Sequence, residues 1–229
     1  MNIPITGLPG VGTARTAHPR DVLAGNAQLA QYVPGLCLID GTKSRDAGNS
    51  PDVDILRAGL LLGKTSGKYA PSILGAISSA VAASATSITV PAAVAVEIVR
   101  RIGSSGTFKL TGPATAGGTA ATQTVTYSAV NQTTGVITCS ALSAASIAGS
   151  FVQPTDGSET IVSLLAARWG QKVTDVSGAS TDTLCDALLL AGHVKTANVI
   201  NYPTDSGLIA WLKAAIHVNC PAVTFDDAF

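Results

Sequence analysis

The chain has 229 residues, of which 46% are hydrophobic and only 12% are charged, about half the share of charged residues in an average soluble domain. The formal net charge is zero, which argues against nucleic-acid binding and against attachment to a membrane through basic residues. We also predict no membrane-spanning helix and no secretory signal, because the sequence has no unbroken apolar run and no basic N-terminal region before one.

Residues 1–54 are interrupted throughout by proline and glycine, which limits regular secondary structure. We predict an extended N-terminal arm that lies on another surface, with one short helix over residues 21–31. Four apolar side chains near the start of this arm are the candidate contacts with that surface: Ile3, Ile5, Leu8 and Val11.

The middle of the chain reads mainly as β-structure. The apolar segment 55–64 predicts a strand that continues into a hairpin turn at 65–68. Residues 71–85 are compatible with a short helix or a loop, and residues 92–101 with a helix or a strand. Residue alternation and Thr, Val and Tyr content predict further strands over residues 87–90, 107–111, 123–130 and 136–140.

This middle part is almost free of charge. Between Tyr69 and Thr155 the charged residues are Glu97, Arg100, Arg101 and Lys109, and residues 110–155 contain none. Such a segment offers few groups for acid–base or nucleophilic chemistry. A surface without ions can be covered by a neighbouring protein without the cost of desolvating charge. We therefore expect it to pack against other subunits.

The last third mixes strands and helices. The sequence predicts strands over 151–153, 159–169, 194–202 and 221–225, a helix with an apolar stripe over 180–190, and a helix over 207–218 capped by Asp205. The predicted class is mainly β (α+β), a small β-barrel or β-sandwich with an inserted β module and one or two helices near the C-terminus.

Motifs for cofactors are weak. The segment Gly59–Thr65 has three residues between its glycines, whereas a phosphate-binding P-loop has four. The four cysteines are widely spaced, so we interpret them as separate, buried, reduced thiols rather than zinc ligands. We predict no catalytic residue, no cofactor and no metal site.

Two segments carry a resemblance to a known family. Ile55-Leu-Arg-Ala-Gly-Leu-Leu-Leu-Gly-Lys64, followed by Ser66-Gly-Lys-Tyr69, resembles the head decoration (capsid cement) proteins of tailed bacteriophages, the lambda-type decoration protein class. Phe151-Val-Gln-Pro-Thr-Asp-Gly-Ser-Glu159, followed by Ile161-Val-Ser-Leu-Leu165, resembles a later part of the same proteins. The resemblance covers about residues 55–70 and 150–200, and it is interrupted by an insert.

The resemblance implies a small β-barrel that binds the outside of an icosahedral capsid as a trimer or dimer. Its partners would be the major capsid protein, through the N-terminal arm, and neighbouring decoration subunits; the protein would be made in the host cytoplasm. We therefore expect an arm over 1–54, a barrel core over 55–70 and 150–229, and an inserted β-rich module over 71–149. The alternatives are another phage structural protein (a head fibre, minor capsid or tail-tube component), an adhesin-like β module, and an enzyme such as a hydrolase.

Overall fold

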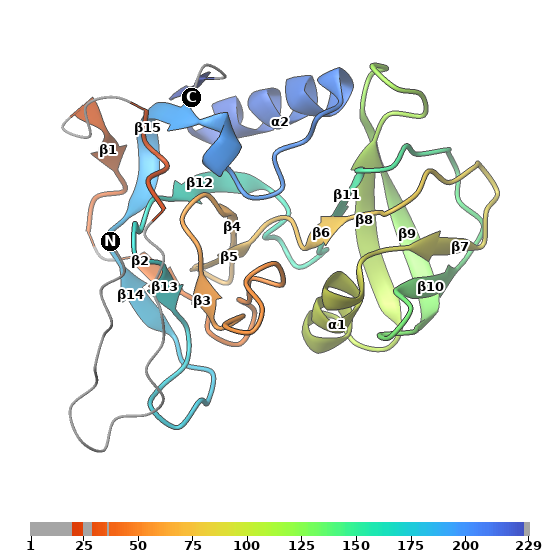
Figure 1. Ribbon diagram of the computed structural model, residues 1–229, viewed down its shortest axis with the longest axis horizontal. Helices are drawn as coiled ribbons and strands as arrows, with labels where there is room; N and C mark the ends of the chain where they lie inside the picture. The colour runs from red at the N-terminus through yellow and green to blue at the C-terminus, as the bar shows by residue number, and fades with distance from the viewer. Residues whose placement is uncertain (1–19, 25–28, 36, 227–229) are drawn as a thin grey trace.

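The computed structural model describes residues 20–24, 29–35 and 37–226, which form two β-rich regions joined side by side (Figure 1). The larger region contains the N-terminal and C-terminal parts of the described chain. The smaller region is formed by the middle of the chain, from β6 to β11. The chain therefore leaves the larger region once and returns to it once.

The larger region is built on a sheet with the strand order β1-β15-β12-β4-β5-β2-β14, and β16 pairs in parallel with β15. Its strands in chain order are β1 (Gln31–Tyr32), β2 (Cys37–Ile39), β4 (Leu61–Thr65), β5 (Lys68–Pro71), β12 (Ile161–Leu165), β14 (Thr183–Cys185), β15 (Leu188–Lys195) and β16 (Ala222–Asp226). A separate two-stranded sheet pairs β3 (Ile55–Leu56) with β13 (Gln171–Lys172).

This larger sheet is curled, and its two ends are close along the chain. Strand β14 pairs with β2, and β15 pairs with β12 near the other end of the strand order. Asp186 and Ala187 are the two residues that lie between β14 and β15. This short connection places β14, at one end of the strand order, near β15 toward the other, and the sheet has the shape of a curled half-barrel, in agreement with the predicted fold class.

The smaller region has a sheet with the order β6-β11-β8-β9-β10-β7 and one covering helix. Its elements are β6 (Gly75–Ala76), β7 (Ser87–Thr89), α1 (Ala92–Arg101), β8 (Gly106–Gly112), β9 (Ala121–Val130), β10 (Val136–Cys139) and β11 (Phe151–Gln153). The buried face of α1 packs with the inward side chains of β8 and β9, including Ile98, Phe108 and Val125. This core is separate from those of the larger region.

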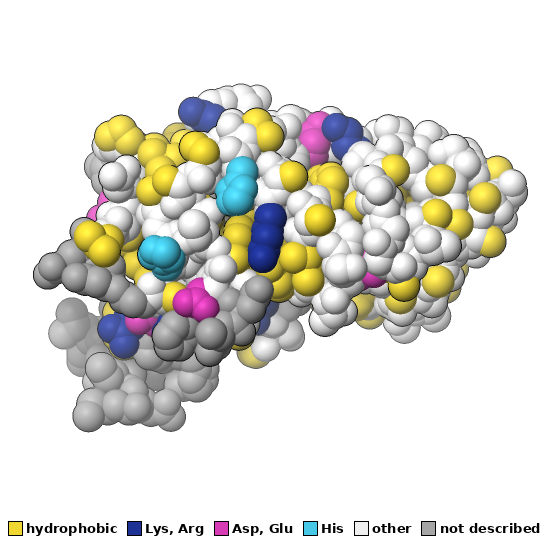
Figure 2. All heavy atoms as spheres, turned by 90° about the horizontal axis from the view of Figure 1, so that it is seen from above, with side chains coloured by type: hydrophobic (Ala, Val, Ile, Leu, Met, Phe, Trp, Pro, Cys, Tyr) yellow, Lys and Arg dark blue, Asp and Glu magenta, His cyan; other side chains and the backbone are white. Residues whose placement is uncertain are grey.

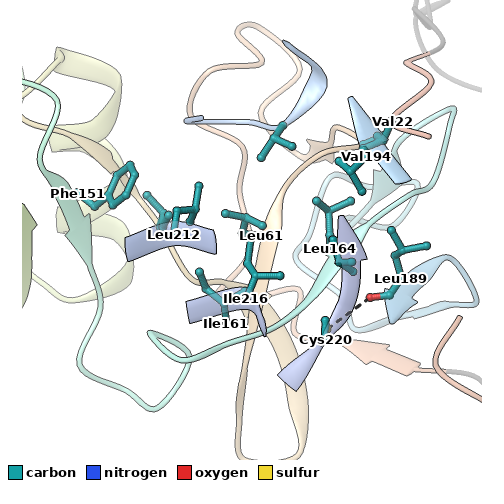
Figure 3. Close-up of a cluster of buried hydrophobic side chains, with 14 of the residues drawn as sticks. Val22, Leu61, Phe151, Ile161, Leu164, Leu189, Val194, Leu212, Ile216 and Cys220 are labelled. Atoms are coloured by element: carbon teal, nitrogen blue, oxygen red, sulfur yellow. Dashed lines mark hydrogen bonds between the residues drawn. The ribbon is translucent and has the colours of Figure 1, made fainter. Parts of the chain in front are cut away.

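Helix α2 (Ser206–Asn219) covers the larger sheet beside a 3-10 helix, η2 (Thr196–Asn198). Leu208, Leu212 and Ile216 form its buried stripe. Figure 3 shows this stripe beside Leu61 and Ile161 of the larger sheet, with Phe151 approaching from the smaller one. The ring centroids of Phe151 and Trp211 are 5.8 Å apart, so α2 also contacts β11 and ties the two regions together.

Several sequence-based predictions are confirmed. Strands β8, β9 and β10 lie where the alternating pattern placed them, with Val125 and Tyr127 buried and Thr124 exposed. The 65–68 turn joins β4 to β5, and Ser66 and Gly67 both have positive φ, as a tight two-residue hairpin turn requires. Asp205 caps α2 by accepting hydrogen bonds from the backbone amides of Gly207 and Leu208.

Four predictions of local structure were wrong. The segment 55–64 is not one strand, because β3 ends at Leu56, β4 begins at Leu61 and the two lie in different sheets. Residues 180–190 form β14 and the start of β15 instead of a helix. Residues 194–202 are a strand only as far as Lys195 and then form η2. The predicted helix over 21–31 does not span that range, because Leu23 forms an antiparallel bridge with Val194 and Gln31 begins β1. Pairing with β15 outweighs the weak helical pattern there.

The described part of the range predicted as an arm, residues 1–54, belongs to the larger region. Strands β1 and β2 lie in the large sheet, and Asp46 is buried against Arg57. Ile3, Ile5, Leu8 and Val11, the candidate capsid contacts, lie outside the described residues.

Candidate functional site

The two sequence segments 55–69 and 151–165 lie side by side in the structure. Strand β4 of the first segment pairs in antiparallel fashion with β12 of the second, with Gly63 opposite Ile161. A Cβ atom on Gly63 would lie 1.7 Å from the carbonyl oxygen of Ser158, so only glycine allows this approach. Segments separated by the whole smaller region therefore form one unit of the fold, which we call the motif junction (residues 61–71 and 154–165).

A partly exposed charge cluster centred on Asp156 lies at the motif junction. Lys43 Nζ lies 3.2 Å from Asp156 Oδ2, and Arg101 Nη2 lies 3.4 Å from the same oxygen. The Ser158 hydroxyl donates a hydrogen bond to Asp156 Oδ1. The Thr65 hydroxyl donates to the backbone oxygen of Asp156 at 2.8 Å, which connects the cluster to β4.

The environment of Asp156 favours its ionised form. Burial alone raises the pKa of this carboxyl group, but the Ser158 hydrogen bond and the positive charge of Arg101 outweigh burial and hold the pKa at about 2. The Arg101 side chain is fully buried. Burial lowers the pKa of the Arg101 guanidinium, and Asp156 opposes that shift. Its Nη1 also donates to the Pro71 carbonyl at 2.7 Å, so Arg101 links α1 to both motif segments.

All four charged residues between Tyr69 and Thr155 lie at this boundary between the regions. Arg100 donates to the Thr42 carbonyl and forms an ion pair with Glu97, with Nη2 2.6 Å from Oε1. Lys109 Nζ lies 2.9 Å from Glu159 Oε1, at the start of the chain's return to the larger region. The charges of the smaller region are therefore used to attach it to the larger one.

The rest of the smaller region presents an uncharged surface. On the outer face of β9 and β10 the exposed side chains carry hydroxyl or methyl groups; we call this the hydroxyl face, and it consists of Thr122, Thr124, Thr126, Ser128, Val136 and Thr138. Figure 2, a view from above, shows few charged side chains on the smaller region and more toward the larger one. Interfaces are depleted in charged residues at their centres, so this face has the chemistry of a contact surface.

A cleft of about 330 Å³ lies where the loop 45–48 meets the segment 73–78 and the start of α1. Two of its charged residues pair with each other: Arg57 Nε and Nη2 bind the two carboxylate oxygens of the buried Asp46 at 2.6 and 2.9 Å. The backbone amide of Gly48 also donates to Asp46. The remaining wall includes Leu60, Ile73 and Arg45, whose guanidinium donates to the Gly41 carbonyl at 2.9 Å.

The segment that resembles a P-loop forms part of the core. Leu60, Leu61 and Leu62 are buried, and residues 61–65 form β4. A Cβ atom on Gly59 would lie 1.9 Å from the carbonyl oxygen of Asn198, so this glycine serves a close backbone contact. The four cysteines are buried and free, as expected, but they are not all separate: Cys37 and Cys185 lie opposite each other on β2 and β14.

Sequence reasoning missed most of the motif junction. It used Asp156 and Ser158 as parts of a turn and gave Arg101 and Lys43 no role. The one signal in the sequence is that Arg101 ends an apolar segment, but its partner Asp156 lies 55 residues away.

No family model, no curated protein and no solved structure matches this chain. Within the described ranges, no group of three or more His, Cys, Asp or Glu side chains is placed to hold a metal ion. None of the helices in that part of the chain is long and apolar enough to cross a membrane.

Proposed function

We propose that this chain is a structural virion protein that binds the outer surface of a phage capsid and stabilises the mature head. The observation that carries the proposal is the motif junction. The two segments that resemble decoration proteins are far apart in sequence, yet β4 and β12 pair directly and share the Asp156 cluster. A resemblance confined to two paired segments is what a common core with a large insertion would give.

The charge distribution supports permanent contact with other subunits. The smaller region uses Arg100, Arg101 and Lys109 at its boundary with the larger region and leaves the hydroxyl face without charge. Covering hydroxyl and methyl groups requires no ion to be desolvated, so such a face can be buried in an assembly at little cost. In this proposal the larger region binds the shell and the hydroxyl face is covered by a neighbouring decoration subunit.

The stabilising mechanism is mass action. A protein that binds the mature lattice and not the disassembled subunits stabilises the lattice by its binding free energy, and many copies multiply the effect. The partners are the major capsid protein and further copies of this chain, arranged as trimers or dimers. Ile3, Ile5, Leu8 and Val11 supply apolar contacts to the major capsid protein.

The direct test adds purified protein to heads assembled from the major capsid protein encoded in the same genome. The proposal expects saturable binding and a higher melting temperature of the heads. Failure to bind, together with an unchanged melting temperature, would contradict it. Labelling of intact particles then separates decoration from the alternatives, because a head decoration protein lies over the whole capsid and a tail-tube or fibre protein does not.

The arm has its own test. Replacing Ile3, Ile5 and Leu8 with serine removes apolar groups, so we expect head binding to fall at least tenfold while the melting temperature of the free protein stays the same. Thr13→Ala with Thr16→Ala is the matched control, since it alters the same segment without removing a large apolar side chain. Equal binding by both variants would exclude the arm as the contact.

A further inference from the structure

Two cysteines lie opposite each other on β2 and the edge strand β14 of the larger sheet. The antiparallel register of β2 and β14 places Cys37 directly opposite Cys185. Both side chains are buried, and both belong to the apolar cluster that contains Ile39 and Leu188. Directly opposite residues in an antiparallel pair point to the same face of the sheet, so the two thiols lie on the inner face together.

The register also satisfies the distance requirement for a disulfide. Opposite residues in antiparallel strands have Cα atoms about 4.5–5.5 Å apart. Disulfides join cysteines whose Cα atoms are roughly 4.4–6.8 Å apart, with side chains directed toward each other. The register of β2 and β14 therefore places the two Cα atoms within the range that a disulfide spans, and joining the thiols requires no change of register.

The other two cysteines have different surroundings. Cys139 lies on β10 of the smaller region, opposite Tyr127. Cys220 follows α2, and its thiol donates to the Val162 carbonyl at 3.2 Å and contacts the Leu189 carbonyl (Figure 3). Neither cysteine is paired in register with another, so the geometry singles out Cys37 and Cys185.

We propose that Cys37 and Cys185 form a site of reversible oxidation, in which a cross-strand disulfide covalently links the edge strand β14 to its neighbour β2. In the first step one thiol loses its proton to solvent and its sulfur attacks a small disulfide such as oxidised glutathione, which releases one glutathione thiolate. The second cysteine then loses its proton, attacks the mixed disulfide and releases the second glutathione. The protein loses two hydrogens, and one small disulfide is reduced to two thiols.

Access to the pair depends on β14. This strand has three residues and lies at the end of the strand order, with β2 as its partner there. Burial raises the pKa of the Cys185 thiol, so the reactive thiolate is scarce while β14 is in place. Opening of a short edge strand costs less than global unfolding, so oxidation proceeds through local opening. Once formed, the disulfide prevents that opening and raises the unfolding midpoint.

The test treats the full chain with oxidised glutathione, blocks remaining thiols with iodoacetamide and maps the tryptic peptides. Each cysteine falls in a different peptide: Cys37 in 21–43, Cys139 in 110–168, Cys185 in 173–195 and Cys220 in 214–229. The proposal expects one linked product that joins 21–43 to 173–195, lost again on reduction. It also expects a higher melting temperature after oxidation, a gain that Cys185→Ala abolishes and Cys139→Ala preserves.

A second experiment removes the dependence on how fast glutathione reaches the buried thiols of the folded protein. The unfolded, reduced chain is refolded in a glutathione redox buffer, where both cysteines are exposed before folding. The same linked peptide should then dominate. If the refolded protein retains four free thiols, or links other peptides, the proposal is wrong. A linked product between two chains in place of one within a chain would also overturn it.

Discussion

The two regions of this molecule keep their shape by different means. The larger region contains the buried Asp46–Arg57 pair, the Asp156 cluster and the Lys68–Asp182 pair, so charge is present inside it and on it. The smaller region relies on an apolar core between α1 and its sheet, and residues 110–155 contain no charge. The smaller region therefore has a stable interior but an exterior poorly suited to standing alone in water.

The two regions differ in where their charged side chains lie. Charged side chains of the smaller region fix it to the larger one at a single boundary, where Arg101 is completely buried. Lys109 on β8 lies directly opposite Thr124 on β9, and beyond this pair the exposed side chains of the same face on β9 and β10 carry hydroxyl or methyl groups. The lack of charge is therefore confined to one part of the molecule, and that part is the surface for which we propose a subunit contact.

The largest expected effect comes from removing the boundary arginine. Arg101→Ala empties the space of a fully buried side chain and removes its contacts with Asp156, the Pro71 carbonyl and the Ser158 hydroxyl, so we expect a loss of about 3–5 kcal/mol in the free energy of unfolding. Lys43→Ala is the control, because Lys43 contacts the same carboxylate from a partly exposed position and should cost less than about 1 kcal/mol. Urea denaturation measures both. Equal losses of unfolding free energy in the two variants would contradict the larger contribution expected from the buried Arg101 side chain.

A smaller effect is expected from crowding the motif junction. In Gly63→Ala the added Cβ meets the backbone of Ser158 and Thr160, so β4 and β12 must separate, at a cost of about 3 kcal/mol. In the control, Gly67→Ala, the space around the new methyl group is open, and positive φ alone costs about 1 kcal/mol. Thermal melting of both variants tests this order. A milder effect at Gly63 than at Gly67 would show that the two strands are not closely joined.

The pH dependence of stability tests the contribution of the ionised Asp156 carboxylate. Its pKa in the folded protein is about 2, below the ordinary value of 3.8, so its ionisation stabilises the fold above pH 4, and this contribution is lost as the pH falls toward 2. We expect about 1 kcal/mol from this group after allowing for its partial exposure. Asp156→Asn should be less stable than the unaltered protein at pH 7, and the gap should close toward pH 2. A gap that stays constant with pH would contradict the assigned ionisation.

Local patterns predicted the smaller region well. The alternation of Val125, Tyr127 and the intervening threonines is visible in one strand, and the turn that follows it is signalled by Asn131 and Gly135. Asp205 was equally readable, because helix capping depends on neighbours in sequence. Where the structural cause is local, the sequence is sufficient.

The incorrect predictions have two physical causes: residue spacings that suit both a helix and a strand, and contacts between residues far apart in the sequence. Leu184 and Leu188 are four residues apart, which suits one face of a helix and one face of a strand equally well. In the structure Leu184 is exposed on β14 and Leu188 is buried on β15, because the chain changes strand between them. The Asp156–Arg101 contact and the Cys37–Cys185 pair join residues far apart in the chain, and no local pattern records such partners.

If a neighbouring subunit covers the hydroxyl face, carboxylates introduced on that face should prevent the subunits from assembling on the head. Thr124→Glu with Thr126→Glu places two carboxylates on exposed positions of β9, and Ala210→Glu with Ala214→Glu places two on exposed positions of α2 as a control. The measurement is the number of copies bound per head at saturation. We predict that the β9 variant keeps its melting temperature but loses most of its binding, while the α2 variant binds normally. Undiminished binding by the β9 variant would contradict the account.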